Sequence, residues 1–152
     1  MSISLERRDV PIPKRMELTI LRPNWPRAAA CLGLIAVVLF GLWMTLVGLA
    51  TSSGLYENLD PVEQAAGGRL AIVSLFGAVA AIFALGGLAL GSRWWATLGG
   101  SGVVAAGVAA LLVGDLWVAG DLQLVLASMA VSLIGVVTII AGRRMEQRSR
   151  LS

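Results

Sequence analysis

Two long uncharged apolar runs near the middle of the chain constrain its fold more than any other feature. Leu70–Leu90 has 21 residues and Ala96–Val113 has 18, and neither run contains Asp, Glu, Lys or Arg. A helix needs roughly 20 residues to cross about 30 Å of bilayer hydrocarbon. The five residues between the runs, Gly91-Ser92-Arg93-Trp94-Trp95, include one cation and two tryptophans, which prefer the headgroup layer. The pattern predicts a hairpin of two transmembrane helices.

Two further apolar runs extend this prediction to four spans. Ala28–Ala50 has 23 residues without a charge, and Leu122–Ala141 has 20. Of all residues 57% are hydrophobic and only 14% are charged, whereas in soluble domains about a quarter are charged. We therefore expect an all-α integral membrane protein with four transmembrane helices in an up-down bundle, spanning about 28–50, 70–90, 96–113 and 122–141.

The positions of the cations predict the orientation of these spans. Six of the twelve Lys and Arg residues lie in 1–27 and four in 143–152. Cytoplasmic loops carry an excess of Lys and Arg, so both termini are expected in the cytoplasm. The domains would be a basic arm (1–27), a membrane domain (28–142) and a basic tail (143–152). The Ala/Gly/Val/Arg-rich usage suggests a multi-pass protein of the bacterial inner (cytoplasmic) membrane.

Cations and tryptophans beside the spans are candidate lipid-interface anchors, and the cations would also contact anionic phospholipids. Cations in these positions favour lipid contact over nucleic-acid binding, which we do not expect. The predicted anchors are Trp25, Arg27, Arg93, Trp94, Trp95, Trp117, Arg143 and Arg144.

Several residues predict where helices begin and end. Asp60-Pro61-Val62-Glu63 is typical of a helix start, so the second helix is expected to begin near Pro61, with the Asp60 side chain accepting from backbone N–H groups. Gly67-Gly68 would be a flexible or kinked point. Asp121 would cap the fourth span and Gly142 would end it.

The N-terminal arm leaves two interpretations open. Met16-Glu17-Leu18-Thr19-Ile20 alternates apolar and polar residues, the period of a half-buried strand. Such a strand would need the sheet edge of a partner; the other interpretation is a disordered tail. Pro23 and Pro26 are expected to stop any helix before the membrane.

Small and hydroxyl residues predict how the helices associate. Gly102, Ala106, Ala110 and Gly114 lie at a spacing of four, and Gly87 and Gly91 repeat that spacing. Such stripes let helix backbones approach closely. We favour contact between the second and third spans over a subunit interface. Ser128, Ser132 and Thr138 are expected to bond to carbonyls of their own helix.

The groups that most membrane chemistry needs are absent from the spans. No span contains Asp, Glu, Lys, Arg or His, the ionisable residues that coupled transport generally requires. Small multidrug-resistance exporters have a similar size and span count, but they rely on a carboxylate that Ala28–Ala50 lacks. The sequence has no histidine and a single cysteine, Cys31. We therefore predict no catalytic residue, no cofactor, no metal site and no enzymatic activity.

Two functions fit this pattern. The first is a non-catalytic accessory or structural subunit of a larger bacterial membrane complex, for example a respiratory, transport or envelope-synthesis assembly. The second is a small oligomeric transporter or channel for an apolar or neutral substrate, although no small-molecule substrate is identified. The partners expected for the first are larger membrane protein subunits, and the predicted contact residues are Arg15, Met16, Leu18, Ile20, Tyr56, Glu57, Asp60, Glu63, Gly102, Ala106 and Ala110.

Overall fold

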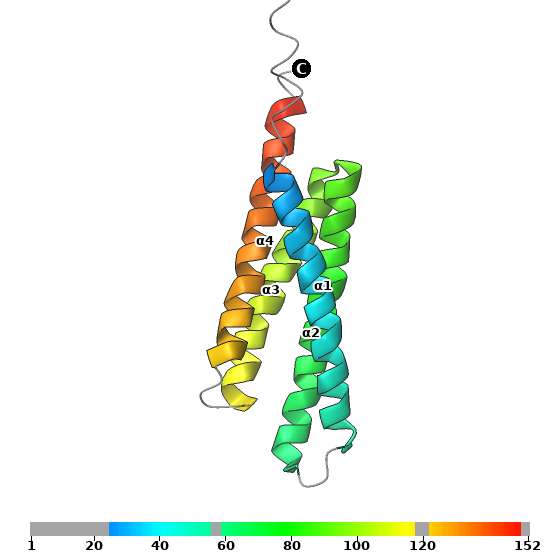
Figure 1. Cartoon of the computed structure of the whole chain (residues 1–152), viewed down its shortest axis with the longest axis vertical. Helices are drawn as coiled ribbons and strands as arrows, with labels where there is room; N and C mark the ends of the chain where they lie inside the picture. Colours follow the sequence, from blue (N-terminus) through cyan, green and yellow to red (C-terminus); the bar gives the residue numbers. More distant parts are fainter. Residues whose placement is uncertain (1–24, 56–58, 118–121, 150–152) are drawn as a thin grey trace, which may run out of the picture.

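The computed structural model describes residues 25–55, 59–117 and 122–149, and these form four α-helices (Figure 1). Their bounds are Trp25–Ser52 for α1, Pro61–Leu90 for α2, Arg93–Trp117 for α3 and Leu122–Ser149 for α4. The described residues contain no strand. Each helix is long and apolar enough to cross a membrane. An all-helical protein with four candidate membrane spans is therefore confirmed.

Each helix packs along the helix that follows it in the chain, whereas α1 and α4 share far fewer contacts. In Figure 1, α1 and α4 lie close together at the end that carries the α2–α3 turn, and they separate toward the opposite end. Where they meet, Gly33 of α1 lies against Ile134 of α4. The structure is thus two helix pairs, α1/α2 and α3/α4, joined along α2 and α3 and open along the α1–α4 seam.

Small residues bring α2 and α3 into close contact. A Cβ atom added at Gly99 would overlap the backbone of Ala84, and one added at Gly87 would overlap the backbone of Ala96. A Cβ at Gly102 would lie 2.8 Å from the Cβ of Ala80. Because lipid tails are as apolar as leucine, the hydrophobic effect does not draw spans together, and close van der Waals packing does so instead.

The same close approach joins α1 to α2. A Cβ at Gly48 would lie 2.6 Å from the carbonyl oxygen of Gly67. The Thr45 hydroxyl donates to its own helix at the Gly41 carbonyl (2.7 Å) and lies 3.5 Å from the carbonyl of Ala71 on α2. The expected flexible point at Gly67-Gly68 is not a break: α2 continues through it as one helix, and Gly67 serves instead as a packing position.

The start and end of α2 follow the sequence signals. Asp60 is the N-cap with extended backbone, and Pro61 lies in the first turn. However, the Asp60 side chain makes no capping hydrogen bond, contrary to expectation. Gly91 ends the helix at φ +71°, a left-handed conformation that glycine adopts without a Cβ clash. Ser92 N–H then donates to the carbonyl of Gly87 at 2.8 Å.

Three other boundaries differ from expectation. α1 begins at Trp25 and holds Pro26 in its first turn, where a missing N–H leaves no intrahelical bond unmade. α3 begins at Arg93, so the α2–α3 turn has fewer residues than expected. α4 continues past Gly142 into residues with good helix propensity, and Gly142 lets it pass Ala96 closely. Asp121 and Met16–Ile20 lie outside the described residues.

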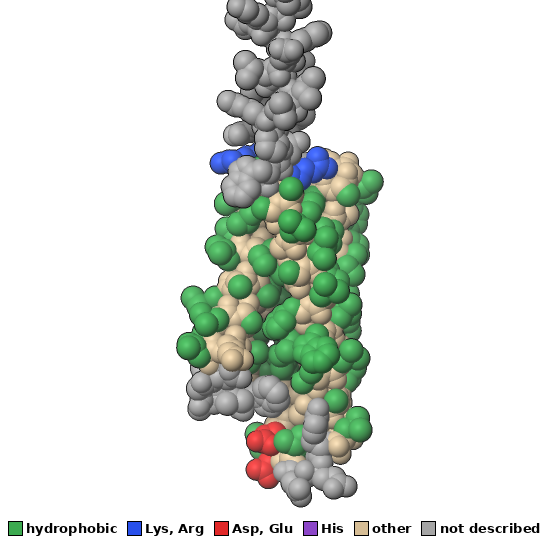
Figure 2. All heavy atoms as spheres, viewed as in Figure 1, with side chains coloured by type: hydrophobic (Ala, Val, Ile, Leu, Met, Phe, Trp, Pro, Cys, Tyr) green, Lys and Arg blue, Asp and Glu red, His purple; other side chains and the backbone are tan. Residues whose placement is uncertain are grey.

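Arg27 links α1 to the end of α2. Its guanidinium donates to the carbonyl oxygens of Leu88 and of Ala89, the latter at 3.3 Å. The last carbonyls of a helix have no partner within the helix, and they carry the negative end of its dipole. In the view of Figure 2, the basic side chains that are visible lie at this end of the molecule and the acidic side chains at the other.

The α2–α3 contact predicts the effect of adding a methyl group. Gly99→Ala should lower the free energy of unfolding by about 1–3 kcal/mol, because the new Cβ must push the two backbones apart. Unfolding in mixed detergent micelles, followed by circular dichroism, measures this. Gly86→Ala is the matched control, since no atom lies within 4 Å of its added Cβ. Equal loss in both variants would contradict the described packing.

The link from Arg27 predicts a second stability effect. Arg27→Ala should lower the free energy of unfolding by about 1–2 kcal/mol, since two charge-assisted hydrogen bonds to carbonyls are lost. The same assay applies. Arg143→Ala removes an exposed cation next to Gly142, which packs on the start of α3 at the same end of the molecule, and should change stability little. If Arg27→Ala and Arg143→Ala have the same free energy of unfolding, the hydrogen bonds from Arg27 to α2 contribute nothing to stability.

Candidate functional site

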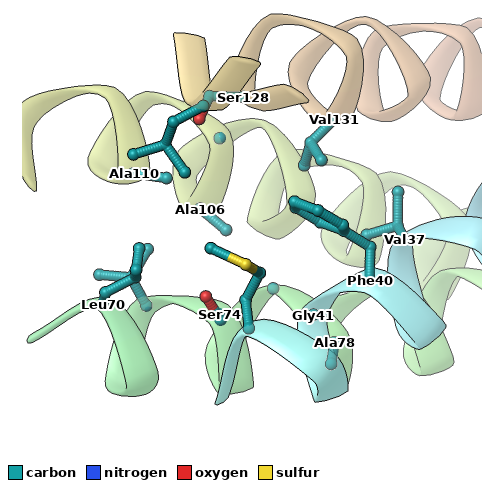
Figure 3. Close-up of a pocket in the computed structure, with 15 residues that line it drawn as sticks. Val37, Phe40, Gly41, Leu70, Ser74, Ala78, Ala106, Ala110, Ser128 and Val131 are labelled. Atoms are coloured by element: carbon teal, nitrogen blue, oxygen red, sulfur yellow. The ribbon is translucent and has the colours of Figure 1, made fainter. Parts of the chain in front are cut away.

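A cavity lies between the two helix pairs and is lined by all four helices (Figure 3). Its volume is about 40 Å³, room for about two to four water molecules if each occupies ~10–15 Å³ on this measure. The residues that line it are Val37, Phe40, Gly41, Met44, Leu70, Val73, Ser74, Gly77, Ala78, Ala106, Gly107, Ala110, Leu124, Ser128 and Val131.

The cavity exists because consecutive helices pack along their length whereas α1 and α4 do not. Beyond the contact of Gly33 with Ile134, toward the end opposite the α2–α3 turn, α1 and α4 separate. The space between the two helix pairs is therefore open on the side where α1 faces α4. Its α2 and α3 walls include small residues such as Gly77 and Ala106, which pack closely on each other and reach no further inward. Phe40 and Met44 of α1 stand at its α1 wall.

Ser74 of α2 and Ser128 of α4 supply the polar side chains of the lining; the other lining residues are apolar or glycine. Figure 3 shows their hydroxyl oxygens on opposite walls, both directed toward the open space. Ser128 is only 4% exposed, and Ser74 is half-buried. Neither hydroxyl forms a hydrogen bond with any described residue. The cavity is therefore bordered by two hydroxyls that can both donate and accept a hydrogen bond, and neither oxygen is a fully buried atom without a partner.

The other hydroxyl side chains that the structure describes in the helices behave differently. Each donates to a carbonyl three or four residues earlier in its own helix, as serine and threonine usually do. The expectation is thus met at Ser132 and Thr138 but not at Ser128, and Ser74 was not singled out from the sequence. The hydroxyls that bond back are those of Thr45, Thr51, Ser52, Thr97, Ser101, Ser132 and Thr138.

The chemistry available in this cavity is neutral. Its lining contains no ionisable side chain, and the described part of the chain holds no group of three or more His, Cys, Asp or Glu residues that a metal ion would need. The arrangement offers hydrogen bonding and apolar contact. Among the lining residues, no acid or base stands beside the two serine hydroxyls.

The predicted partner-contact residues do not gather at one place. Ala106 is buried against Gly77 in the α2–α3 contact, Gly102 packs on Ala80, and Ala110 lines the cavity. Asp60 and Glu63 are exposed at the start of α2. The remaining contact predictions, Arg15, Met16, Leu18, Ile20, Tyr56 and Glu57, lie outside the described residues.

The predicted interface anchors lie near helix ends. Trp94 and Trp95 are exposed in the first turn of α3, and Trp95 stacks on Phe83 of α2 with ring centroids 5.5 Å apart. Arg93, Arg143 and Arg144 are exposed. The Arg27 guanidinium instead donates hydrogen bonds to carbonyl oxygens of α2. Trp25 is the first residue of α1 and Trp117 the last of α3.

Cys31 and Trp43 occupy two unlike positions on α1. Cys31 is half-buried, as a free thiol, against the apolar core. Trp43 is 65% exposed on the outer surface of the helix, so in this chain it does not pack between helices. Neither residue belongs to the cavity lining.

Comparison of the chain with protein-family models, with curated protein sequences and with solved structures gave no match.

Proposed function

We propose that this chain is a non-catalytic accessory subunit of a larger membrane protein complex in the bacterial inner membrane. The observation that carries the proposal is the open α1–α4 seam. α1 and α4 meet only near one end, and the chain supplies no described helix that fills the rest. In lipid, such a seam offers close van der Waals contact to a further transmembrane helix.

The surface beside the seam fits contact with another helix. Phe40 of α1 is 40% exposed at the cavity wall, and Met44 lies one turn further along the same face. Methionine and small residues adapt to a neighbouring helix more readily than branched side chains do. The apolar lining of the seam also supports a contact that does not depend on charge.

The proposed orientation is an up-down bundle with both termini cytoplasmic. It is supported by the bias of Lys and Arg toward the two ends of the sequence and by Arg27, Arg93, Arg143 and Arg144, which lie near the helix ends on one side of the bundle, whereas Arg69 lies near the start of α2 on the other. In this orientation the basic arm and tail meet the anionic lipid surface and the cytoplasmic face of a partner.

The orientation predicts the result of reporter fusions. Green fluorescent protein fused after Ser152 should fluoresce, because it folds in the cytoplasm, while alkaline phosphatase fused after Leu55 should be active outside. Measuring both activities for fusions at both sites provides the internal control. Active phosphatase after Ser152 would place the C-terminus outside and refute this orientation.

The accessory role predicts co-purification. The tagged chain, extracted in mild detergent, should carry larger membrane subunits at fixed stoichiometry. Met44→Trp should reduce their recovery several-fold, because a bulky ring would occupy the seam. Leu46→Trp is the matched control: Leu46 is 64% exposed on α1 and is not part of the cavity lining. Recovery of the unmodified chain alone, as a homo-oligomer, would refute the accessory role.

The second candidate function is a small oligomeric transporter or channel for a neutral substrate. The cavity with Ser74 and Ser128 favours it, because neutral hydrogen-bonding groups within a span are suited to an uncharged solute. A homo-oligomer that accelerates the flux of a neutral solute into liposomes would support this function over the accessory role.

A further inference from the structure

We infer that the cavity between the helix pairs is a hydrated binding site, which takes water and, by the same chemistry, neutral hydrogen-bonding solutes of similar size. This inference goes beyond the accessory role and does not depend on it. It rests on Ser74 and Ser128, on the space between them and on the neutral character of the lining.

The two hydroxyls are the first part of the argument. A serine in a helix normally bonds to a carbonyl of the preceding turn, which occupies its O–H donor. Seven other hydroxyl side chains of the helices do so. Ser128 does not: the residue is only 4% exposed, but its hydroxyl oxygen points into the cavity and is not a fully buried atom, so it is open to a ligand there.

The size of the space selects the ligand. A buried water requires about 10–15 Å³ and at least two polar partners. The cavity offers about 40 Å³, with one hydroxyl on α2 and another on α4. A few water molecules would therefore bridge Ser74 to Ser128 and satisfy both. The lining carries no charge that would hold an ion, and an entirely apolar ligand would leave both hydroxyls unpaired.

The cavity lies close enough to one end of α4 for water to reach it. Ser128 is six residues beyond Leu122, the first residue of α4, or about 9 Å along the helix at ~1.5 Å per residue. The seam between α1 and α4 widens toward this end. The same end carries the exposed Asp60 and Glu63 at the start of α2, which belong in water or headgroups. Ser128 therefore lies less than two helical turns from the start of α4, at the end of the molecule that carries these acids.

The test is water-edited solid-state NMR on the full-length, isotopically labelled protein in liposomes. Magnetisation from water should reach the side chains of Ser74 and Ser128 at least about twofold faster than it reaches the side chain of Thr138, since bound water lies against the two serines. Thr138 is a stringent control because it is fully buried on α4 and its hydroxyl bonds to Ile134. Equal build-up at all three residues would overturn the inference.

A variant separates bridging water from accidental exposure. Ser128→Val removes the hydroxyl and fills part of the space, so build-up at Ser74, across the cavity, should fall to the Thr138 rate. Ser101→Val, at an exposed hydroxyl outside the lining, should leave Ser74 unchanged. If Ser128→Val does not fold, Ser128→Ala removes the hydroxyl with less change in volume. Transfer to the serines from lipid methylenes in place of water would also overturn the proposal.

Discussion

Close approach of helix backbones is the constraint on which the rest of this structure depends. In lipid the apolar surface of a span gains nothing by turning inward, so helices associate only where their backbones come close enough for dense van der Waals contact. Gly48 provides that approach between α1 and α2, Gly99 between α2 and α3, and Gly135 between α3 and α4, because a Cβ at any of them would meet the neighbouring backbone. Each consecutive helix pair is held in this way.

The arrangement of these contacts also explains the cavity. The close contacts follow the order of the chain, from α1 to α2 to α3 to α4, and leave α1 and α4 joined only near one end. A bundle closed all round would have filled its interior with side chains at the density of a protein core. Here the interior keeps a space, and the two serines that border it have hydroxyls without a partner among the described residues. The open seam and the polar cavity therefore have one origin.

Much of the fold followed from the sequence, because span length and hydropathy are local properties. The four helices, the start of α2 at Pro61 and the turn at Gly91 were all readable from residue types. The helix boundaries near Pro26 and Gly142 were harder to predict from residue types. Both residues disfavour helix in isolation, yet Pro26 falls in a first turn that needs no N–H donor, and Gly142 packs against Ala96.

The candidate site was much less predictable. Sequence alone determined that four uncharged apolar segments are present, that no histidine exists and that the cations gather toward the ends, because these depend only on which residues follow one another. Tertiary structure decided that α1 and α4 do not close along their length, that Arg27 joins α1 to α2, and that Ser74 faces Ser128. These are relations between residues far apart in the chain, and they arise only when packing sets the rotation and tilt of each helix.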